Sequence, residues 1–172
     1  MRKVVLFIAT SLDGYIAGSD GDTSWLFTGG DFGYSKFYDS IDTTLMGYNT
    51  YYFVKQFGTF PYPDKKNYVF TRKEREPDGN PVTFVMGDIA QFVAKLKYQE
   101  GNNIYLVGGG QVNSVLLNAE LIDEMIISVH PIALGQGIPL FKDRSLRTLQ
   151  FQLTAHEVFE RGLVQLTYSK SK

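Results

Sequence analysis

The chain has 172 residues, of which 44% are hydrophobic and 20% charged, and 17 Lys and Arg against 18 Asp and Glu leave a net charge of −1. This balance gives no field to recruit nucleic acid or an anionic membrane, so a small molecule is the expected partner. The absence of cysteine excludes disulfides and thiolate nucleophiles, and two histidines make a metal site unexpected. The length suits one domain over residues 1–172, and without a signal-peptide pattern we expect a soluble cytoplasmic protein.

The first half of the chain alternates short apolar runs with segments of helical periodicity. The expected elements are a strand over 4–9, a loop over 10–22, a helix over 32–41, a strand over 43–46, a helix over 48–54 and a strand over 67–70. Asn49 or Thr50 is expected to cap the second helix. The loop over 10–22 is long for a simple connection, and such loops are often binding elements or lids.

The second half continues the alternation and ends differently. The expected elements are a strand over 82–85, a helix from 89 to near 101, a strand over 104–107, a helix to about 118, a strand over 124–129, a glycine-bearing loop over 134–141 and a hairpin from 151–155 and 164–168. Asp88 and Gln91 have the spacing of a capping box, and Arg161-Gly162 is the expected hairpin turn. The order predicts an α/β fold with a mostly parallel central sheet, flanking helices and a C-terminal antiparallel hairpin at its edge.

Three glycines, Gly108, Gly109 and Gly110, stand where a strand passes into a helix. Glycine lets the backbone approach a ligand, and the unpaired amides of a helix's first turn suit a phosphate. A sharp turn without a ligand would need the same residues. Because Gly47 and Thr71 also follow strands of the predicted parallel sheet, these loops are expected at one edge, which favours cofactor binding.

Four segments carry a resemblance to a known family: Ser11 to Ala17, Met46 to Tyr51, Leu106 to Gly110 and Pro131 to Phe141. Their order resembles the dihydrofolate reductase superfamily, and more closely its branch with the reductase domain of riboflavin-biosynthesis enzymes. The resemblance spans nearly the whole chain. It implies a dihydrofolate reductase-like fold and a nicotinamide cofactor laid across the strand ends.

The resemblance also implies which residues bind the cofactor. They are Gly108, Gly109, Gly110, Gln111 and Val112 at the pyrophosphate, Gly47, Tyr48, Asn49 and Thr50 at the second helix start, Thr71, Arg72 and Lys73 at the adenosine 2′-phosphate, and Ala9, Ile16 and Ala17 beside the nicotinamide. NADPH is favoured over NADH because Arg72 and Lys73 could neutralise the additional phosphate. Tyr48 departs from the arginine that many dihydrofolate reductases have there, which weakens this preference.

Fewer residues are implied on the substrate side. Asp13 and Asp31 are the candidate catalytic carboxylates, and Trp25 is the candidate aromatic residue for stacking the substrate. Asp13 could equally stabilise its own Asp-Gly turn, and Trp25 could simply anchor a loop. For His130, at the end of a strand, we expect satisfaction by a backbone group rather than acid catalysis.

These features together predict an NADPH-dependent reductase that transfers a hydride to a small flat heterocycle resembling a pterin or an aminopyrimidine. Two alternatives stay open. One is an NADP(H)-binding module or sensor without turnover, and the other is the riboflavin-pathway reductase of 5-amino-6-ribosylaminouracil phosphate. The apolar alternation of the edge hairpin and the family resemblance both favour a homodimer.

Overall fold

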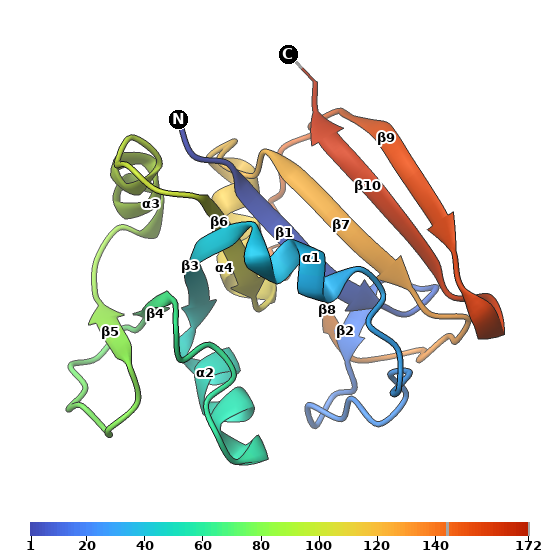
Figure 1. Cartoon of the computed structure of the whole chain (residues 1–172), viewed down its shortest axis with the longest axis horizontal. Coiled ribbons are helices and arrows are strands. Elements are labelled where there is room, and N and C mark those ends of the chain that lie inside the picture. Colours follow the sequence, from blue (N-terminus) through green and yellow to red (C-terminus); the bar gives the residue numbers. More distant parts are fainter. Residues whose placement is uncertain (144, 172) are drawn as a thin grey trace.

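Six parallel strands form the centre of the molecule in a computed structural model that describes residues 1–143 and 145–171. The eight-stranded sheet has the order β5-β4-β3-β6-β1-β7-β10-β9, in which β10 runs antiparallel to both of its neighbours, β7 and β9 (Figure 1). The strands are β1 (Val4–Thr10), β3 (Ile41–Gly47), β4 (Lys66–Phe70), β5 (Val82–Val85), β6 (Asn103–Gly108), β7 (Glu124–Val129), β9 (Phe151–Val158) and β10 (Val164–Lys170). The predicted fold class, with its hairpin at the sheet edge, is confirmed.

The helices cover both faces of the parallel part of the sheet. They are α1 (Tyr34–Asp39), α2 (Tyr48–Val54), α3 (Ile89–Lys97) and α4 (Gly110–Asn118), and short 3₁₀ turns lie at η1 (Lys55–Phe57) and η2 (Glu160–Gly162). Leu106 packs with Val93 of α3 and Leu116 of α4, and Tyr105, its neighbour in β6, packs on the other face with Phe37 of α1. The apolar runs without alternation are therefore explained, because strands β1 and β6 are buried on both sides.

A second, two-stranded sheet lies within segments that the sequence predicted to be loops. It pairs β2 (Tyr15–Ala17) with β8 (Ile138–Pro139), so the loops over 10–22 and 134–141 each contain a short strand. Two or three residues are too few for a recognisable alternation. The pair is nevertheless important, because it fixes the long loop after β1 against the glycine-bearing loop that follows β7.

Helices α1 and α3 are shorter than predicted, and α2 has a different N-cap residue. Helix α1 has only the residues Tyr34–Asp39, because Gly33 in a left-handed conformation precedes it and Ile41 already opens β3. The predicted cap of α2 by Asn49 or Thr50 is wrong: its N-cap is Gly47, without a side-chain cap. The Asp88 cap is confirmed, since its carboxylate accepts from the Gln91 amide at 3.0 Å, although α3 already ends at Lys97.

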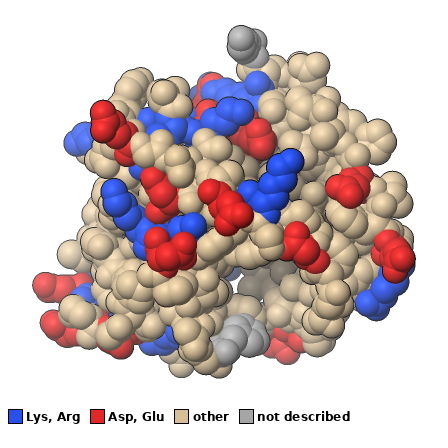
Figure 2. Space-filling view, viewed as in Figure 1, with Lys and Arg blue, Asp and Glu red and all other residues tan. Residues whose placement is uncertain are grey.

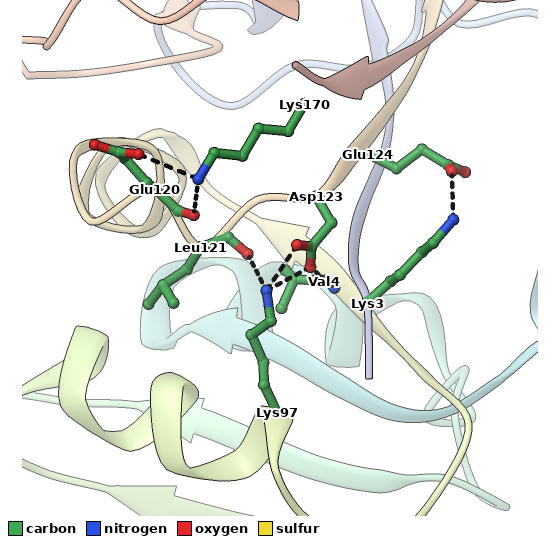
Figure 3. A network of polar contacts seen from close by, with 8 residues as sticks. All are labelled: Lys3, Val4, Lys97, Glu120, Leu121, Asp123, Glu124 and Lys170. Carbon is green, nitrogen blue, oxygen red and sulfur yellow. Dashed lines mark hydrogen bonds and ion pairs between the residues drawn. The ribbon is translucent and has the colours of Figure 1, made fainter. Parts of the chain in front are cut away.

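A polar network ties α3 to the amino ends of β1 and β7 (Figure 3). The Lys97 ammonium, on a residue only 4% exposed, donates to both Asp123 carboxylate oxygens at 2.8 and 2.6 Å and to the Leu121 carbonyl at 3.3 Å. One Asp123 oxygen also accepts the Val4 amide at 2.7 Å. The buried ammonium is thus fully hydrogen-bonded to a half-buried carboxylate and a carbonyl, at the sheet edge away from the glycine turn.

The charged side chains on the face shown in Figure 2 are mixed in sign, as the balanced composition predicts. Among the described residues, no helix has both the length and the apolar character needed to cross a membrane. The same view shows the surface hollowed between α2 and the loop that carries β2, which is the carboxyl edge of the parallel strands.

Candidate functional site

The glycine turn stands at the carboxyl end of β6, next to the ends of β1 and β3. Gly108 has a φ of 103°, a left-handed value that favours glycine, and the Gly108–Gly109 peptide is cis. The Gly109 amide donates to the Thr50 hydroxyl of α2 at 3.0 Å. The predicted residues Thr50 and Gly109 therefore meet, and the Thr50 hydroxyl joins the starts of α2 and α4.

Close packing requires a glycine at position 110, the third glycine of the turn. A Cβ on Gly110 would lie 2.5 Å from the carbonyl oxygen of Pro139 in β8, and the Gly110 carbonyl accepts the Lys142 amide at 3.1 Å. The glycines thus serve the turn itself, which the sequence left open beside the phosphate interpretation. They do so while keeping the first-turn amides of α4 at the strand edge.

Two helix starts lie side by side here without side-chain caps. Helix α2 begins after Gly47 and α4 after Gly109, and neither N-cap residue supplies a side-chain hydrogen bond. The first amides of a helix need partners, and the helix dipole places partial positive charge there. A Cβ on Gly47 would lie 3.2 Å from a Val112 methyl, so the two junctions are in contact. The pair forms a cradle that suits an anion.

The basic turn after β4 adds charge to the same edge. The Thr71 hydroxyl accepts from the Lys73 amide at 3.2 Å and donates to the Lys73 carbonyl, which closes the turn, and Arg72 and Lys73 are exposed. No sequence motif indicated Arg75, whose guanidinium carbon lies 3.8 Å from the centroid of the Tyr48 ring. A cation thus stands beside Tyr48, the position where the resemblance predicted an arginine.

The residues predicted beside the nicotinamide come together through β2. Ala9 is the next-to-last residue of β1, and Ile16 and Ala17 belong to β2. The β8 loop is bonded at both ends, because the Leu140 amide donates to the Gly14 carbonyl at 3.0 Å while Lys142 bonds Gly110. The structure therefore brings the predicted residues of β1, β2, α2 and α4 to one edge.

A cavity of about 260 Å³ opens at this edge beside β1. Phe7 and Ala9 of β1 line it, together with Phe27, Asp31, Phe32 and Tyr34 from the following segment. Ser128, His130 and Leu163 complete the wall from β7 and the hairpin. The cavity is mostly apolar with a few polar groups, as small-molecule sites usually are.

His130 is a fixed part of this wall. The Phe27 amide donates to its Nε2 at 3.2 Å, so Nδ1 carries the proton and donates to the Ser128 carbonyl at 3.2 Å. Burial lowers the pKa of His130, and the charge of Arg161 acts in the same direction. Both ring nitrogens are used by backbone groups, so the expectation that the backbone satisfies this histidine is confirmed.

Asp31 is one of the residues that line the cavity, and Ser35 of α1 holds its carboxylate. Its Oδ1 accepts the Ser35 hydroxyl at 2.5 Å and the Ser35 amide at 2.9 Å. These bonds lower the pKa of Asp31, so the carboxylate is ionised at neutral pH. In this state it can accept hydrogen bonds from a ligand.

Asp13 joins two loops. Its carboxylate accepts the Ser11 hydroxyl at 2.6 Å and the amides of Leu134 and Gly135 at 3.1 and 2.7 Å. The Ser11 hydroxyl and then the Leu134 amide lower the pKa of Asp13 from 3.8 to about 2. The observed contacts hold the loop after β1 against the loop after β7, and the catalytic role of Asp13 stays a prediction.

This geometry predicts a defined pH dependence for the loop contact. Because the pKa of Asp13 is lowered in the folded state, the contact is fully present above about pH 4 and is lost as the pH falls towards 2. We expect the Leu134 and Gly135 amides to exchange faster in Asp13→Asn at pH 6, measured by hydrogen exchange. Asp20→Asn is the matched control, and equal exchange in the two variants would contradict the contact.

A wider hollow of about 730 Å³ lies at the opposite edge, around Arg2 and Asn103. The Arg2 guanidinium there is already used, because it pairs with Asp42 and donates to the Thr43 hydroxyl. Ligands of open α/β sheets bind at the carboxyl ends of the strands. The smaller cavity, at the carboxyl ends of β1 and β7, is therefore the candidate site.

Trp25 is not among the aromatic residues that line the cavity. Its indole lies edge-on to the His130 ring at 5.3 Å and donates to the Asp22 carbonyl, and Phe27 is the nearby aromatic residue that lines the cavity. Stacking of a substrate on Trp25 stays a prediction. The wall residues Phe7, Tyr34 and Ser128 were missed, since each lies in a segment that the sequence explained by core packing or helix periodicity alone.

Comparison with known proteins agrees with this geometry. The family model described as "RibD C-terminal domain" matches residues 2–165. The uncharacterized protein YwjB of Bacillus subtilis (strain 168) is 42% identical over 174 residues, which cover 99% of each chain. The crystal structure of a candidate riboflavin biosynthesis protein from Shewanella sp. PV-4 superposes with a TM-score of 0.88 and 33% identity, over 99% of this chain and 100% of the other.

A more distant structure shows the wider fold. Dihydrofolate reductase from Enterococcus faecalis, solved with NADP(H), superposes with a TM-score of 0.70 and 18% identity, over 99% of this chain and 97% of the other. The dihydrofolate reductase-like fold is thereby confirmed. With the family match over nearly the whole length, the chain belongs to the RibD C-terminal domain family of reductase-like proteins.

Proposed function

We propose that this chain is an NADPH-dependent reductase that transfers a hydride to a flat nitrogen heterocycle of the pterin or aminopyrimidine kind. The observation that carries the proposal is the position of Ala9. It lines the apolar cavity, and it is the next-to-last residue of β1, the strand beside which the family resemblance puts the nicotinamide. A ring in the cavity would therefore lie next to the end of the cofactor that reacts.

The residues present fit the cofactor. The uncapped starts of α2 and α4 suit the pyrophosphate, and Arg75 beside Tyr48, with the exposed Arg72 and Lys73, offers cations for the adenosine phosphate. NADPH would supply the hydride. This supports NADPH over NADH, although Tyr48 replaces the expected arginine.

On the substrate side, the chain's own residues bind and orient. Phe7 and Phe27 offer aromatic surfaces for a flat ring, and the ionised Asp31 can accept hydrogen bonds from ring amino groups. The contacts that lower the pKa values of Asp13 and Asp31 keep both carboxylates ionised at neutral pH. We therefore propose that water delivers the proton and that these carboxylates position groups around it.

The experiment has two parts. Calorimetry with NADPH and NADH should give the tighter dissociation constant for NADPH, and absorbance at 340 nm should fall when a pterin or aminouracil substrate is added. Absence of nucleotide binding would exclude the reductase. Tight NADPH binding without turnover on any ring substrate would instead identify a binding module or sensor.

The riboflavin-pathway reductase itself is the second candidate, and the family match favours it. Its substrate, 5-amino-6-ribosylaminouracil phosphate, carries a phosphate as well as a flat ring. Turnover of this compound in preference to reduced or oxidised pterins would identify that activity.

We also propose a homodimer formed through the hairpin. Strand β9 is exposed along nearly its whole length, and the register puts Val158 and Val129 on either side of Val164, on one sheet face. Val158 is 68% and Leu153 47% exposed, so a second copy could cover an apolar surface. Light scattering should give twice the chain mass and, for Val158→Asp, the mass of one chain; a monomeric wild type would reject the dimer.

A further inference from the structure

One wall of the substrate cavity is formed by a segment without regular structure. Residues 18–33 contain neither a helix nor a strand, yet the cavity is lined from this segment by Leu26, Phe27, Gly30, Asp31 and Phe32. A helix or a strand is fixed by its own backbone hydrogen bonds. This wall segment, residues 26–32, therefore depends on bonds that other parts of the fold supply.

Two side chains from the sheet hold the wall segment by its backbone. The Phe27 amide donates to His130 Nε2 at 3.2 Å, and the Phe32 carbonyl accepts from Gln165 Nε2 at 3.0 Å. Both anchors meet at Ser128, whose carbonyl accepts from His130 Nδ1 at 3.2 Å and whose hydroxyl accepts from Gln165 Nε2 at 3.0 Å. The wall is thus tied at two points, to the end of β7 and to β10.

His130 is the anchor that can change its charge. The rings of Trp25 and Phe27 lie edge-on to the imidazole, with centroids 5.3 and 4.9 Å away, and His130 is only 4% exposed, so water has little access to the bond. Its Nε2 accepts the Phe27 amide only in the uncharged state, because both nitrogens of an imidazolium donate. Protonation would place two N–H groups against each other and release the wall segment at Phe27.

The charged groups around His130 favour the uncharged imidazole. Burial lowers the pKa of His130 below 6.5, and the positive charge of Arg161 in η2 acts in the same direction. The bonds from Ser35 lower the pKa of Asp31, and burial raises the pKa of Tyr34 to about 12, so these two wall residues keep their charge between about pH 5 and pH 7.5. The contact is therefore fully present above pH 6.5 and is lost as the pH falls through the lowered pKa of His130.

We propose that His130 is a positioning residue for the ring substrate: the uncharged imidazole holds the Phe27 backbone, and with it the cavity wall, where a ring can bind. The proposal rests on the proposed function, because it assumes that the cavity receives the ring. It adds the requirement that ring binding needs an uncharged His130. The residues proposed for the pyrophosphate belong to α2 and α4, so the affinity for the cofactor should depend little on this histidine.

The first part of the test needs no ligand. Hydrogen exchange followed by NMR on the full chain gives the protection factor of the Phe27 amide, and the imidazole ¹⁵N shifts show which nitrogen carries the proton. We expect protection at about pH 7.5 that falls on acidification, with a midpoint below 6.5. His130→Leu, which has no acceptor, should lose the protection at both ends of this range.

The second part measures ring binding. Dissociation constants of dihydrobiopterin and of 5-amino-6-ribosylaminouracil phosphate are determined by calorimetry with NADP⁺ present, between about pH 5 and pH 7.5. His130→Leu should weaken the compound that binds by about tenfold at the upper pH, the effect of leaving a buried amide without its acceptor. In the wild type, the affinity should fall on acidification together with the protection of the Phe27 amide.

The control variants separate the titration of His130 from packing. His130→Gln keeps an acceptor that does not titrate, so it should bind the ring more tightly than His130→Leu and lose the pH dependence. Gln165→Leu removes the other anchor and should weaken ring binding while keeping the pH dependence. His156→Gln changes the second histidine, which is exposed on β9, and should behave as the wild type. Titration of the ring compound itself affects all variants equally.

Three results would overturn the proposal. They are equal protection of the Phe27 amide in the wild type and His130→Leu, an unchanged pH dependence of ring binding in His130→Gln, and failure of both ring compounds to bind. NADPH binding measured on the same samples decides the cofactor part of the proposed function separately. Circular dichroism of each variant at each pH checks that the chain is folded.

Discussion

Asp123→Ala is expected to lower the free energy of unfolding by about 3–5 kcal/mol, because it leaves a buried ammonium without its counter-ion. Lys97 is 4% exposed and gives two of its hydrogen bonds to Asp123 (Figure 3). The same substitution removes the acceptor of the Val4 amide at the start of β1. Urea denaturation followed by circular dichroism measures the loss.

The neighbouring pair of Lys3 and Glu124 provides a control. These side chains meet at 3.5 Å, but the Lys3 side chain is 59% exposed, so Glu124→Ala should cost at most about 1 kcal/mol. Lys97→Met with Asp123→Asn should recover part of the loss, because it removes the buried charge. Equal losses in Asp123→Ala and Glu124→Ala would show that burial of Lys97 has no energetic consequence.

Gly110→Ala is expected to raise the dissociation constant for NADPH at least about tenfold, equivalent to about 1.4 kcal/mol. The added Cβ would lie 2.5 Å from the Pro139 carbonyl oxygen, so either the β8 loop or the start of α4 must move. Movement of either disturbs the proposed pyrophosphate cradle. Overpacking of this kind also costs about 1–3 kcal/mol of stability. Calorimetry and denaturation measure the two effects.

Gly21→Ala is the control that separates the loss of NADPH affinity from the loss of stability. Gly21 has a φ of 88° and open space around its Cβ position, so alanine strains the backbone without a collision. We expect a stability loss of about 1 kcal/mol and unchanged NADPH affinity. If the affinity of Gly110→Ala for NADPH equalled that of the wild type, the cradle would not be where we propose it.

The fold was largely predictable because its signals are local. Apolar runs such as 104–107 are strands buried on both faces, and hydrophobic periodicity identified α3. Strands β2 and β8 have three and two residues, too few for a pattern, and form because the loops are held together. Helix α1 was overestimated because its periodicity continues into Ile41, which pairs with Asn103 in the sheet instead.

The residues of the proposed cofactor edge were easier to nominate from the sequence than those of the proposed substrate cavity, for a physical reason. Each glycine junction, and the basic turn, consists of adjacent residues, so a short sequence motif is enough to recognise it. The cavity wall combines Phe7, Phe27, Ser128 and Leu163, whose proximity depends on the tertiary fold. Arg75 was missed likewise, since a solvated arginine and one stacked on an aromatic ring look the same in a sequence.

The loop that contains β8, at Leu140 and Lys142, acts as a spacer of fixed length. Through Leu140 it holds Gly14, and through Lys142 it holds Gly110, so one short segment sets the separation between the β2 loop and the glycine turn. Because this separation is established when the chain folds, the two loops would lose little conformational entropy on binding the dinucleotide that we propose as cofactor.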